Sequence, residues 1–207
     1  MLAGLDHIIL GANDLGRGID WVEERTGVRA ALGGVHPGRG TQNALVALGA
    51  DCYLEIIAPD PSQPFVTWFT QINSITQPKL LTWAAHTSDL DALAQRVRAE
   101  GLAIDGPHQG KRTRPDSKVL SWRLFHLRNN YGGLLPFFIE WNPNSVHPAT
   151  DAPAGCTLDR FELQSPHAQE LARVCRILGV EVPIVLGSRS LIRARIRSPK
   201  GLVDLAS

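Results

Sequence analysis

The sequence is poor in cysteine, has no excess of charge and lacks long apolar runs. Its three cysteines are odd in number and show no C-x-x-C spacing, so we expect reduced thiols of a cytosolic protein. Lys plus Arg number 21 and Asp plus Glu 20, which excludes a general attraction to nucleic acid or to an acidic membrane surface. No uncharged stretch reaches the roughly 20 residues of a membrane helix, and no signal-peptide pattern opens the chain. We therefore expect a cytoplasmic protein that binds neither nucleic acid nor membrane.

Several catalytic motifs are also missing. The sequence has no Gly-x-Ser-x-Gly elbow, no P-loop and no zinc-finger spacing, so hydrolase, nucleotide-hydrolase and finger functions lack motif support. The glycines of segment 33–40 open a strand rather than a helix, which excludes a Rossmann domain. Arg193, Arg195 and Arg197 alternate with apolar residues, a pattern typical of a half-buried strand with one solvated face.

A pattern of strand, helix start, helix and terminating glycine occurs three times. It runs from Leu5 to Gly27, from Leu80 to Gly101 and from Leu158 to Gly179, and two or three extended segments follow each copy. Repeats of this length fit duplication of a half-domain rather than a solenoid. The sequence therefore predicts an α+β fold of repeated βαβββ modules.

Three residues occupy equivalent positions in these repeats. His7, Thr82 and Arg160 lie 20, 19 and 19 residues before the terminating glycine of their copy. Side chains along a strand alternate between its two faces, so residues of equal parity share a face. The predicted shared faces are Leu5, His7 and Ile9; Tyr53, Glu55 and Ile57; and Phe138 with Glu140. Each face carries one ionisable group among apolar or aromatic ones.

These segments resemble the vicinal-oxygen-chelate superfamily, and within it the glyoxalase-like domains. The resemblance rests on segments 5–10, 36–45, 53–59, 112–116 with 122–123, and 137–141. It implies modules at 1–60 and 80–142 that form a half-open barrel around a small-molecule cleft, in a domain of residues 1–150. Residues 151–207 are expected to form a partial third βα module packed on it, as a lid or an interface.

The resemblance also implies a ligand set for a metal. In metal-dependent members each module supplies a histidine from its first strand and a glutamate from its last, which points to His7, Glu55 and Glu140 here. Thr82 stands where the fourth ligand would be. Such ligands suit zinc, nickel, iron or manganese, and Glu140 or Glu55 would then remove a proton beside a carbonyl that the metal polarises.

The alternative to a metal site is left open by the sequence. His7 would then be a hydrogen-bonded core histidine, the glutamates would pair with arginines such as Arg114 and Arg123, and no metal would be bound. Other histidines could instead replace the missing ligand at Thr82. These candidates are His36, His86 and His126.

Two further segments suggest substrate-binding groups. His36, Arg39 and Asn43 surround a glycine-rich turn, which suits an anionic ligand, although an ordinary loop is an equal alternative. Arg114 comes shortly before an extended segment that carries Trp122 and Arg123. We expect Arg114 to anchor an anion together with these two residues. The neighbouring residues 111–112 are expected to be a solvated loop.

We therefore expect a metal-dependent lyase or isomerase of the glyoxalase type, acting on a small 2-oxo or vicinal-dioxygen compound. The alternative is a metal-free protein that binds a small molecule in the same cleft, with walls drawn from Trp83, Trp122, Phe138 and Trp141. A ring-cleaving dioxygenase is a third hypothesis and would need His86 or His126 as a ligand. Open sheet edges favour a homodimer.

Overall fold

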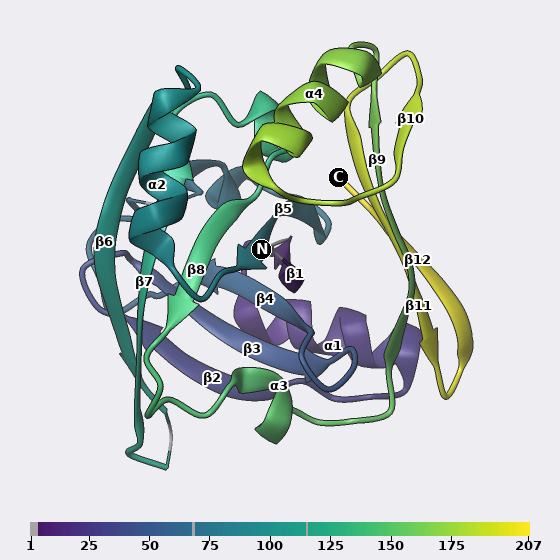
Figure 1. Ribbon diagram of the computed structural model, residues 1–207. Coiled ribbons are helices and arrows are strands. Elements are labelled where there is room, and N and C mark those ends of the chain that lie inside the picture. The colour runs from purple at the N-terminus through teal and green to yellow at the C-terminus, as the bar shows by residue number, and fades with distance from the viewer. Residues whose placement is uncertain (1–3, 68, 115) are drawn as a thin grey trace.

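The computed structural model describes residues 4–67, 69–114 and 116–207, whose strands form two sheets (Figure 1). The larger sheet has the order β2-β3-β4-β1-β5-β8-β7-β6, and the smaller has the order β10-β9-β11-β12. The expected α+β fold with a curled half-barrel is confirmed. Residues 1–3 of the N-terminal segment and Pro115 of the 112–116 motif lie outside the described residues.

The elements follow the predicted order of strands and helices. The larger sheet contains β1 (Gly4–Gly11), β2 (Ala31–His36), β3 (Thr41–Ala47), β4 (Tyr53–Pro59), β5 (Lys79–His86), β6 (Ile104–Thr113), β7 (Val119–Leu127) and β8 (Phe137–Trp141). The smaller contains β9 (Thr157–Ser165), β10 (Ile184–Leu186), β11 (Leu191–Ser198) and β12 (Gly201–Ala206). The helices are α1 (Leu15–Thr26), α2 (Leu90–Ala99), α3 (Pro148–Asp151) and α4 (Ala168–Leu178), with 3₁₀ turns η1 (Thr70–Ser74) and η2 (Tyr131–Gly133).

Local signals explain where the helices begin and end. Asp14 accepts a hydrogen bond from the Arg17 amide at 2.8 Å and caps α1, while Asp89 accepts one from the Ala92 amide at 2.9 Å and caps α2. Gly27 ends α1 in the left-handed region at φ 76°, a conformation that costs glycine little. The sequence therefore specifies these helix boundaries locally.

The two modules of the larger sheet pair with each other inside one chain. Strands β1 and β5, the first of each module, run antiparallel at the centre, and each also pairs in parallel with the last strand of its own module. In this register His7 lies opposite Ala84 and Ile9 opposite Thr82. This reciprocal pairing is what a two-fold relation between the modules requires, so His7 and Thr82 are equivalent positions, as the spacing predicts.

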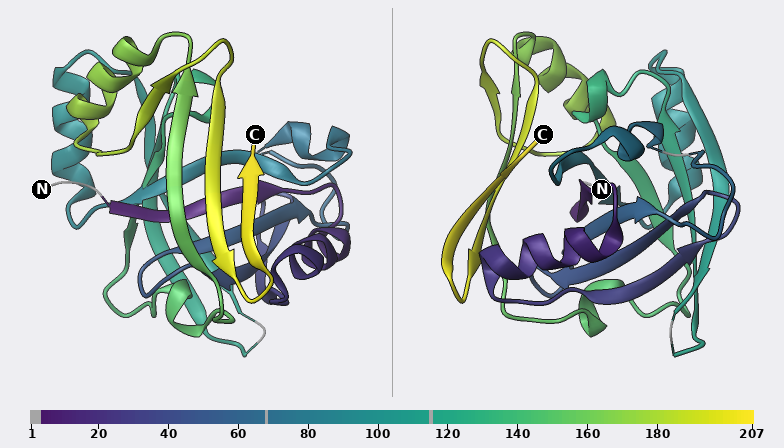
Figure 2. Two further views of the ribbon diagram at one scale, coloured as in Figure 1. Left: turned by 90° about the vertical axis from the view of Figure 1, so that its right-hand side faces the viewer. Right: turned by 180° about the vertical axis from the view of Figure 1, so that it is seen from behind.

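The larger sheet curls until its edge strands β2 and β6 approach each other (Figure 2). Glycine makes this approach possible, because a Cβ on Gly34 would stand 2.5 Å from the carbonyl oxygen of Thr113. Gly34 also has φ 137°, a conformation that side chains disfavour. The concave face of the sheet is thus drawn into an enclosed interior. Strand β6 covers residues 104–113, so the expectation of a solvated loop at 111–112 is wrong.

The smaller sheet packs against the outside of the barrel beside β5, with α4 next to α2 and β12 next to α1 (Figures 1 and 2). Its first strand, β9, pairs in parallel with β10 and antiparallel with β11. The third unit therefore repeats the strand and helix of the modules but not their strand order. Arg195 and Arg197 pair with Asp204 and Asp159 on its outer face, as expected for a solvated face. A homodimer through open sheet edges stays a prediction.

Apolar side chains form cores on both faces of the larger sheet. The main core fills the space between its convex face, helices α1, α2 and α4, and the smaller sheet. A second cluster lies inside the barrel and includes Ile9, Ile57, Leu124, Phe137 and Ile139. Within residues 4–67, 69–114 and 116–207, no helix is long and apolar enough to cross a membrane.

Candidate functional site

The concave face encloses a cavity of about 430 Å³. Apolar side chains from the inner cluster line one part of it, together with Trp122 and Trp141. Ionisable side chains from β1, β2, β4, β6 and the segment between β2 and β3 line the rest. A mostly apolar cavity with a few converging polar groups is the usual form of a small-molecule site.

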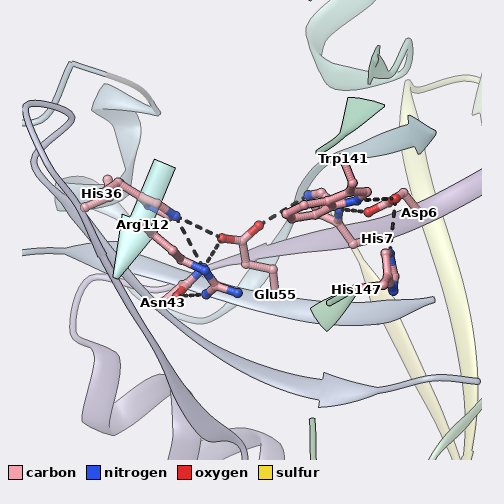
Figure 3. Close-up of polar contacts among 9 residues, drawn as sticks. Asp6, His7, His36, Asn43, Glu55, Arg112, Trp141 and His147 are labelled. Atoms are coloured by element: carbon pink, nitrogen blue, oxygen red, sulfur yellow. Dashed lines mark hydrogen bonds and ion pairs between the residues drawn. The ribbon is translucent and has the colours of Figure 1, made fainter. Parts of the chain in front are cut away.

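His7 stands at the centre of the polar side (Figure 3). Its side chain is 3% exposed; Nδ1 lies 2.6 Å from Asp6 Oδ1, and Nε2 lies 3.3 Å from Glu55 Oε2. Because a carboxylate accepts at Nδ1, that nitrogen carries a proton and Nε2 is the nitrogen that faces Glu55. The Tyr53 ring stacks on the imidazole with centroids 4.6 Å apart. The orientation of His7 is thus fixed on two sides.

Asp6 connects His7 to the second module. Its Oδ2 accepts a hydrogen bond from Trp141 Nε1 at 2.9 Å and lies 3.3 Å from His147 Nε2. Burial raises the pKa of Asp6, but hydrogen bonds from His147 and His7 outweigh burial and hold the pKa well below its usual value. Asp6 is therefore an ionised, fully buried carboxylate with three donors around it.

Glu55 is held from the opposite side by an amide and a guanidinium. Its Oε1 accepts a hydrogen bond from Asn43 Nδ2 at 2.5 Å, and Asn43 Oδ1 accepts one from Arg112 Nη1 at 2.7 Å. Burial raises the pKa of Glu55, but the nearby His7 and His36, the Asn43 hydrogen bond and the charge of Arg112 lower it overall. Glu55 is therefore ionised near neutral pH.

His36 lies on the Asn43 side of Glu55 (Figure 3). Its Nε2 is 3.8 Å from Glu55 Oε1 and 3.4 Å from Asn43 Nδ2, and its Nδ1 is 2.9 Å from Thr41 Oγ1. Burial lowers the pKa of His36, and the charge of Arg112 adds to this effect. A neutral ring that donates from Nδ1 to Thr41 and accepts from Asn43 at Nε2 fits these contacts.

The structure brings six of the predicted site residues to the cavity. They are His7, His36, Arg39, Asn43, Glu55 and Trp122. Arg114 is not among them, because it pairs with Asp151 at 2.6 Å and with Asp116 at 3.3 Å. Arg123 pairs with Asp91 at 2.5 Å and lines a neighbouring groove instead.

Glu140 does not lie with His7 and Glu55. It shares a face with Phe138, as parity predicts, but this is the convex face of the sheet. There its Oε1 accepts from the Leu90 amide at 3.1 Å, at the start of α2, and its Oε2 lies 3.3 Å from Arg123 Nη1. In β1 the expectation that Leu5 and His7 share a face is wrong, because a bulge between them places Leu5 against the main core.

The second module supplies neither of the ligands that the family pattern implies. Thr82 donates its hydroxyl to the carbonyl of Gly133 at 3.1 Å. Glu55 lies opposite Ile9 in the pairing of β4 with β1, and Phe137 lies opposite Ala84 in the equivalent pairing of β8 with β5. An aromatic ring therefore occupies the position equivalent to that of the glutamate.

The alternative histidines do not restore the set. His86 is exposed at the end of β5, and His126 lies with its ring 5.2 Å from Phe137 without lining the cavity. His36 faces Glu55 from the side opposite His7 (Figure 3). In the part of the chain that the structure describes, no group of three metal-ligating side chains converges. The donors present do not fit the four-ligand metal centre.

Sequence reasoning missed three residues of the site. Asp6 precedes His7, so strict alternation would place the two side chains on opposite faces of β1. The bulge in β1 allows Asp6 to bond His7. His147 comes from the segment after β8 and had no motif to mark it. Arg112 lies in β6 and is 3% exposed, although its basic neighbourhood suggests contact with solvent.

Comparisons with known proteins agree with this architecture. The family model described as a glyoxalase-like domain matches residues 5–178. A hypothetical protein from Staphylococcus aureus shares the fold at 17% identity with a TM-score of 0.72, covering 91% of this chain and 88% of its own. A Streptomyces coelicolor methylmalonyl-CoA epimerase does so at 18% identity and a TM-score of 0.52, covering 70% and 99%. No curated protein matches the sequence. The chain belongs to the glyoxalase-like domain family.

Proposed function

We propose that the protein is an isomerase or lyase that transfers a proton on a small oxygenated compound bound in the cavity. The observation that carries the proposal is the Glu55 carboxylate, which is buried yet ionised and held between His7 and Asn43. A carboxylate so placed can accept a proton from a carbon next to a carbonyl group. The products of the resulting enolate decide between isomerase and lyase.

The surrounding groups support this chemistry. Asp6 orients His7, as a carboxylate orients the histidine of many acid–base sites, so that Nε2 faces Glu55 and can exchange a proton with it. Arg112 adds positive charge beside Glu55, which favours the anion that forms when the substrate loses its proton. The apolar wall excludes water and strengthens these electrostatic effects.

The proposed reaction uses the chain's own residues and no metal step. The superfamily includes metal-dependent enzymes, but here one module contributes His7 and Glu55 and the other contributes Thr82 and Phe137. The likeness to the Streptomyces epimerase, at 18% identity, concerns the fold and does not identify a substrate. The substrate class we propose is a compound with a carbonyl next to a C–H bond.

Exchange of carbon-bound hydrogen tests the proposal directly. Small 2-oxo acids are incubated with the protein in D₂O, and proton NMR follows the loss of the C–H signal beside the carbonyl. We expect exchange in the parent, loss in Glu55→Gln, and parent rates in the matched control Glu140→Gln, whose carboxylate lies outside the cavity. Treatment with a chelator should leave the rate unchanged. Equal exchange in parent and Glu55→Gln would refute the role of Glu55.

A metal-free binding protein is the second candidate. The observation that favours it is the pairing of Glu55, whose Oε1 accepts from Asn43 Nδ2 and whose Oε2 lies 3.3 Å from His7 Nε2. A carboxylate held on both sides can serve recognition without chemistry. Quenching of tryptophan fluorescence by a bound 2-oxo acid, with no exchange in D₂O, would support binding alone.

A further inference from the structure

We propose that Arg112 is the anchor for an oxyanion of the ligand, a carboxylate or a phosphate group, inside the cavity. The inference rests on the proposed function, because it takes this cavity as the ligand site. It differs from the sequence expectation, which gave the role to Arg114. The structure pairs Arg114 with Asp151 and Asp116 and leaves Arg112 facing the cavity.

The hydrogen bonds of Arg112 leave most of its donors for a ligand. A guanidinium carries five N–H donors in a planar fork. Over residues 4–67, 69–114 and 116–207, the bond from Nη1 to Asn43 Oδ1 is the one side-chain hydrogen bond that Arg112 makes, and it forms no ion pair. Asp116 and Asp151 pair with Arg114, and Asn43 lies between Arg112 and Glu55.

A buried cation without a direct ion pair is unfavourable. Arg112 is 3% exposed, and removing a charged group from water costs free energy unless an opposite charge or hydrogen bonds offset it. An oxyanion that accepts two parallel N–H bonds offsets that cost and matches the guanidinium geometry. Binding of an anion would therefore be favoured at this place.

Neighbouring residues are arranged around the guanidinium. A Cβ on Gly33 would stand 2.1 Å from Arg112 Nη1 and 2.3 Å from Asn43 Oδ1, so the missing side chain in β2 leaves the room that this pair occupies. Arg39 and Lys111 line the same cavity, which gives three cations against the carboxylate of Glu55 among the described lining residues. The electrostatic field of the cavity therefore favours an anion.

The position of Arg112 fits the proton transfer as well. Asn43 bridges the guanidinium and Glu55 (Figure 3), so an oxyanion held by Arg112 brings the next carbon atoms of the ligand beside the carboxylate. Positioning of this kind contributes to rate by fixing the reacting atoms in place. The substrate class becomes a small anion with a carbonyl next to a C–H bond.

Binding of malonate and of inorganic phosphate tests the inference and separates its two sources. Quenching of tryptophan fluorescence reports occupancy, because Trp122 and Trp141 line the cavity. We expect the parent to bind at least one of the two anions and Arg112→Gln to bind it on the order of tenfold or more weakly. Arg112→Lys keeps the charge but lacks the fork and should lie between them. Arg114→Gln is the matched control and should bind as the parent does.

Each outcome decides for or against the anchor. Binding of malonate alone identifies a carboxylate, and binding of phosphate alone identifies a phosphoryl group. No binding of either anion by the parent, or parent affinity in a folded Arg112→Gln, would overturn the inference. If Arg112→Gln does not fold, Arg112→Lys carries the test. Anion binding without any hydrogen exchange would refute the proposed function alone, while exchange at parent KM in Arg112→Gln would refute the anchor alone.

Discussion

Replacement of Asp6 by asparagine tests the network that orients His7. Asp6 is fully buried, and its carboxylate accepts from His7 and Trp141 and lies 3.3 Å from His147 Nε2. Asparagine has nearly the same shape, but its amide nitrogen donates and cannot accept. One of the N–H groups around position 6 would then face another donor inside the protein.

The expected cost follows from these contacts. Removing one partner of a buried charged network leaves the other polar groups without compensation, which costs about 3 to 5 kcal/mol of unfolding free energy. The low pKa of Asp6 adds a dependence on pH. Since the folded pKa lies below the unfolded one, the unfolded chain binds a proton first on acidification. The stabilisation is present above the unfolded pKa near 3.8 and is lost as the pH falls through the folded value.

Urea unfolding followed by tryptophan fluorescence measures both effects. We expect Asp6→Asn to unfold at a clearly lower urea concentration than the parent at pH 7, and the difference to shrink on acidification below about pH 4. Asp204→Asn, which removes an exposed carboxylate paired with Arg195, is the control and should change the midpoint little. An Asp6→Asn midpoint equal to that of the parent at pH 7 would refute the network as a source of stability.

Two further predictions concern other residues of the barrel. Burial lowers the pKa of His126 to about 4, so between about pH 6.5 and 4 the unfolded chain alone binds that proton and the unfolding free energy falls by up to about 3 kcal/mol. In His126→Gln, the urea midpoints at pH 7 and pH 4.5 should differ less than they do in the parent. A difference as large as that of the parent would contradict this prediction. A Cβ in Gly110→Ala would stand 2.3 Å from Trp122 Nε1, so we expect a loss of about 1 to 3 kcal/mol and an altered near-ultraviolet circular dichroism spectrum.

The elements that the sequence specified best are those with local signals. Helix α1 begins after the Asp14 cap and ends at Gly27, the glycine that terminates the first copy of the predicted pattern. Strand β6 lacks such a pattern, because polar and glycine residues dominate its ten positions. It forms through pairing with β7, the next strand of the chain, and through the approach of β2, which is distant in sequence. The burial of Arg112 therefore depends on contacts between strands and not on a pattern within β6.

The site was predictable where alternation holds and unpredictable where it fails. Tyr53 and Glu55 share the inner face because β4 is regular throughout its pairing with β1 and β3. Parity also grouped Phe138 with Glu140 correctly, but it cannot say which face of β8 is concave. Asp6 depends on a bulge that no residue pattern marked. Spacing thus yields groups of residues, while the curvature of the sheet decides which groups meet.

The two modules share a geometry and divide the chemistry unequally. The first supplies Asp6, His7 and Glu55, and the second places Phe137 where the symmetry would put another carboxylate. The Phe137 ring lies 5.4 Å from the His7 ring, and Trp141 of the same strand donates to Asp6. The second module therefore excludes water from the ionised groups and fixes their orientation. Because charges interact more strongly where water is excluded, this arrangement supports the proton transfer that we propose at Glu55.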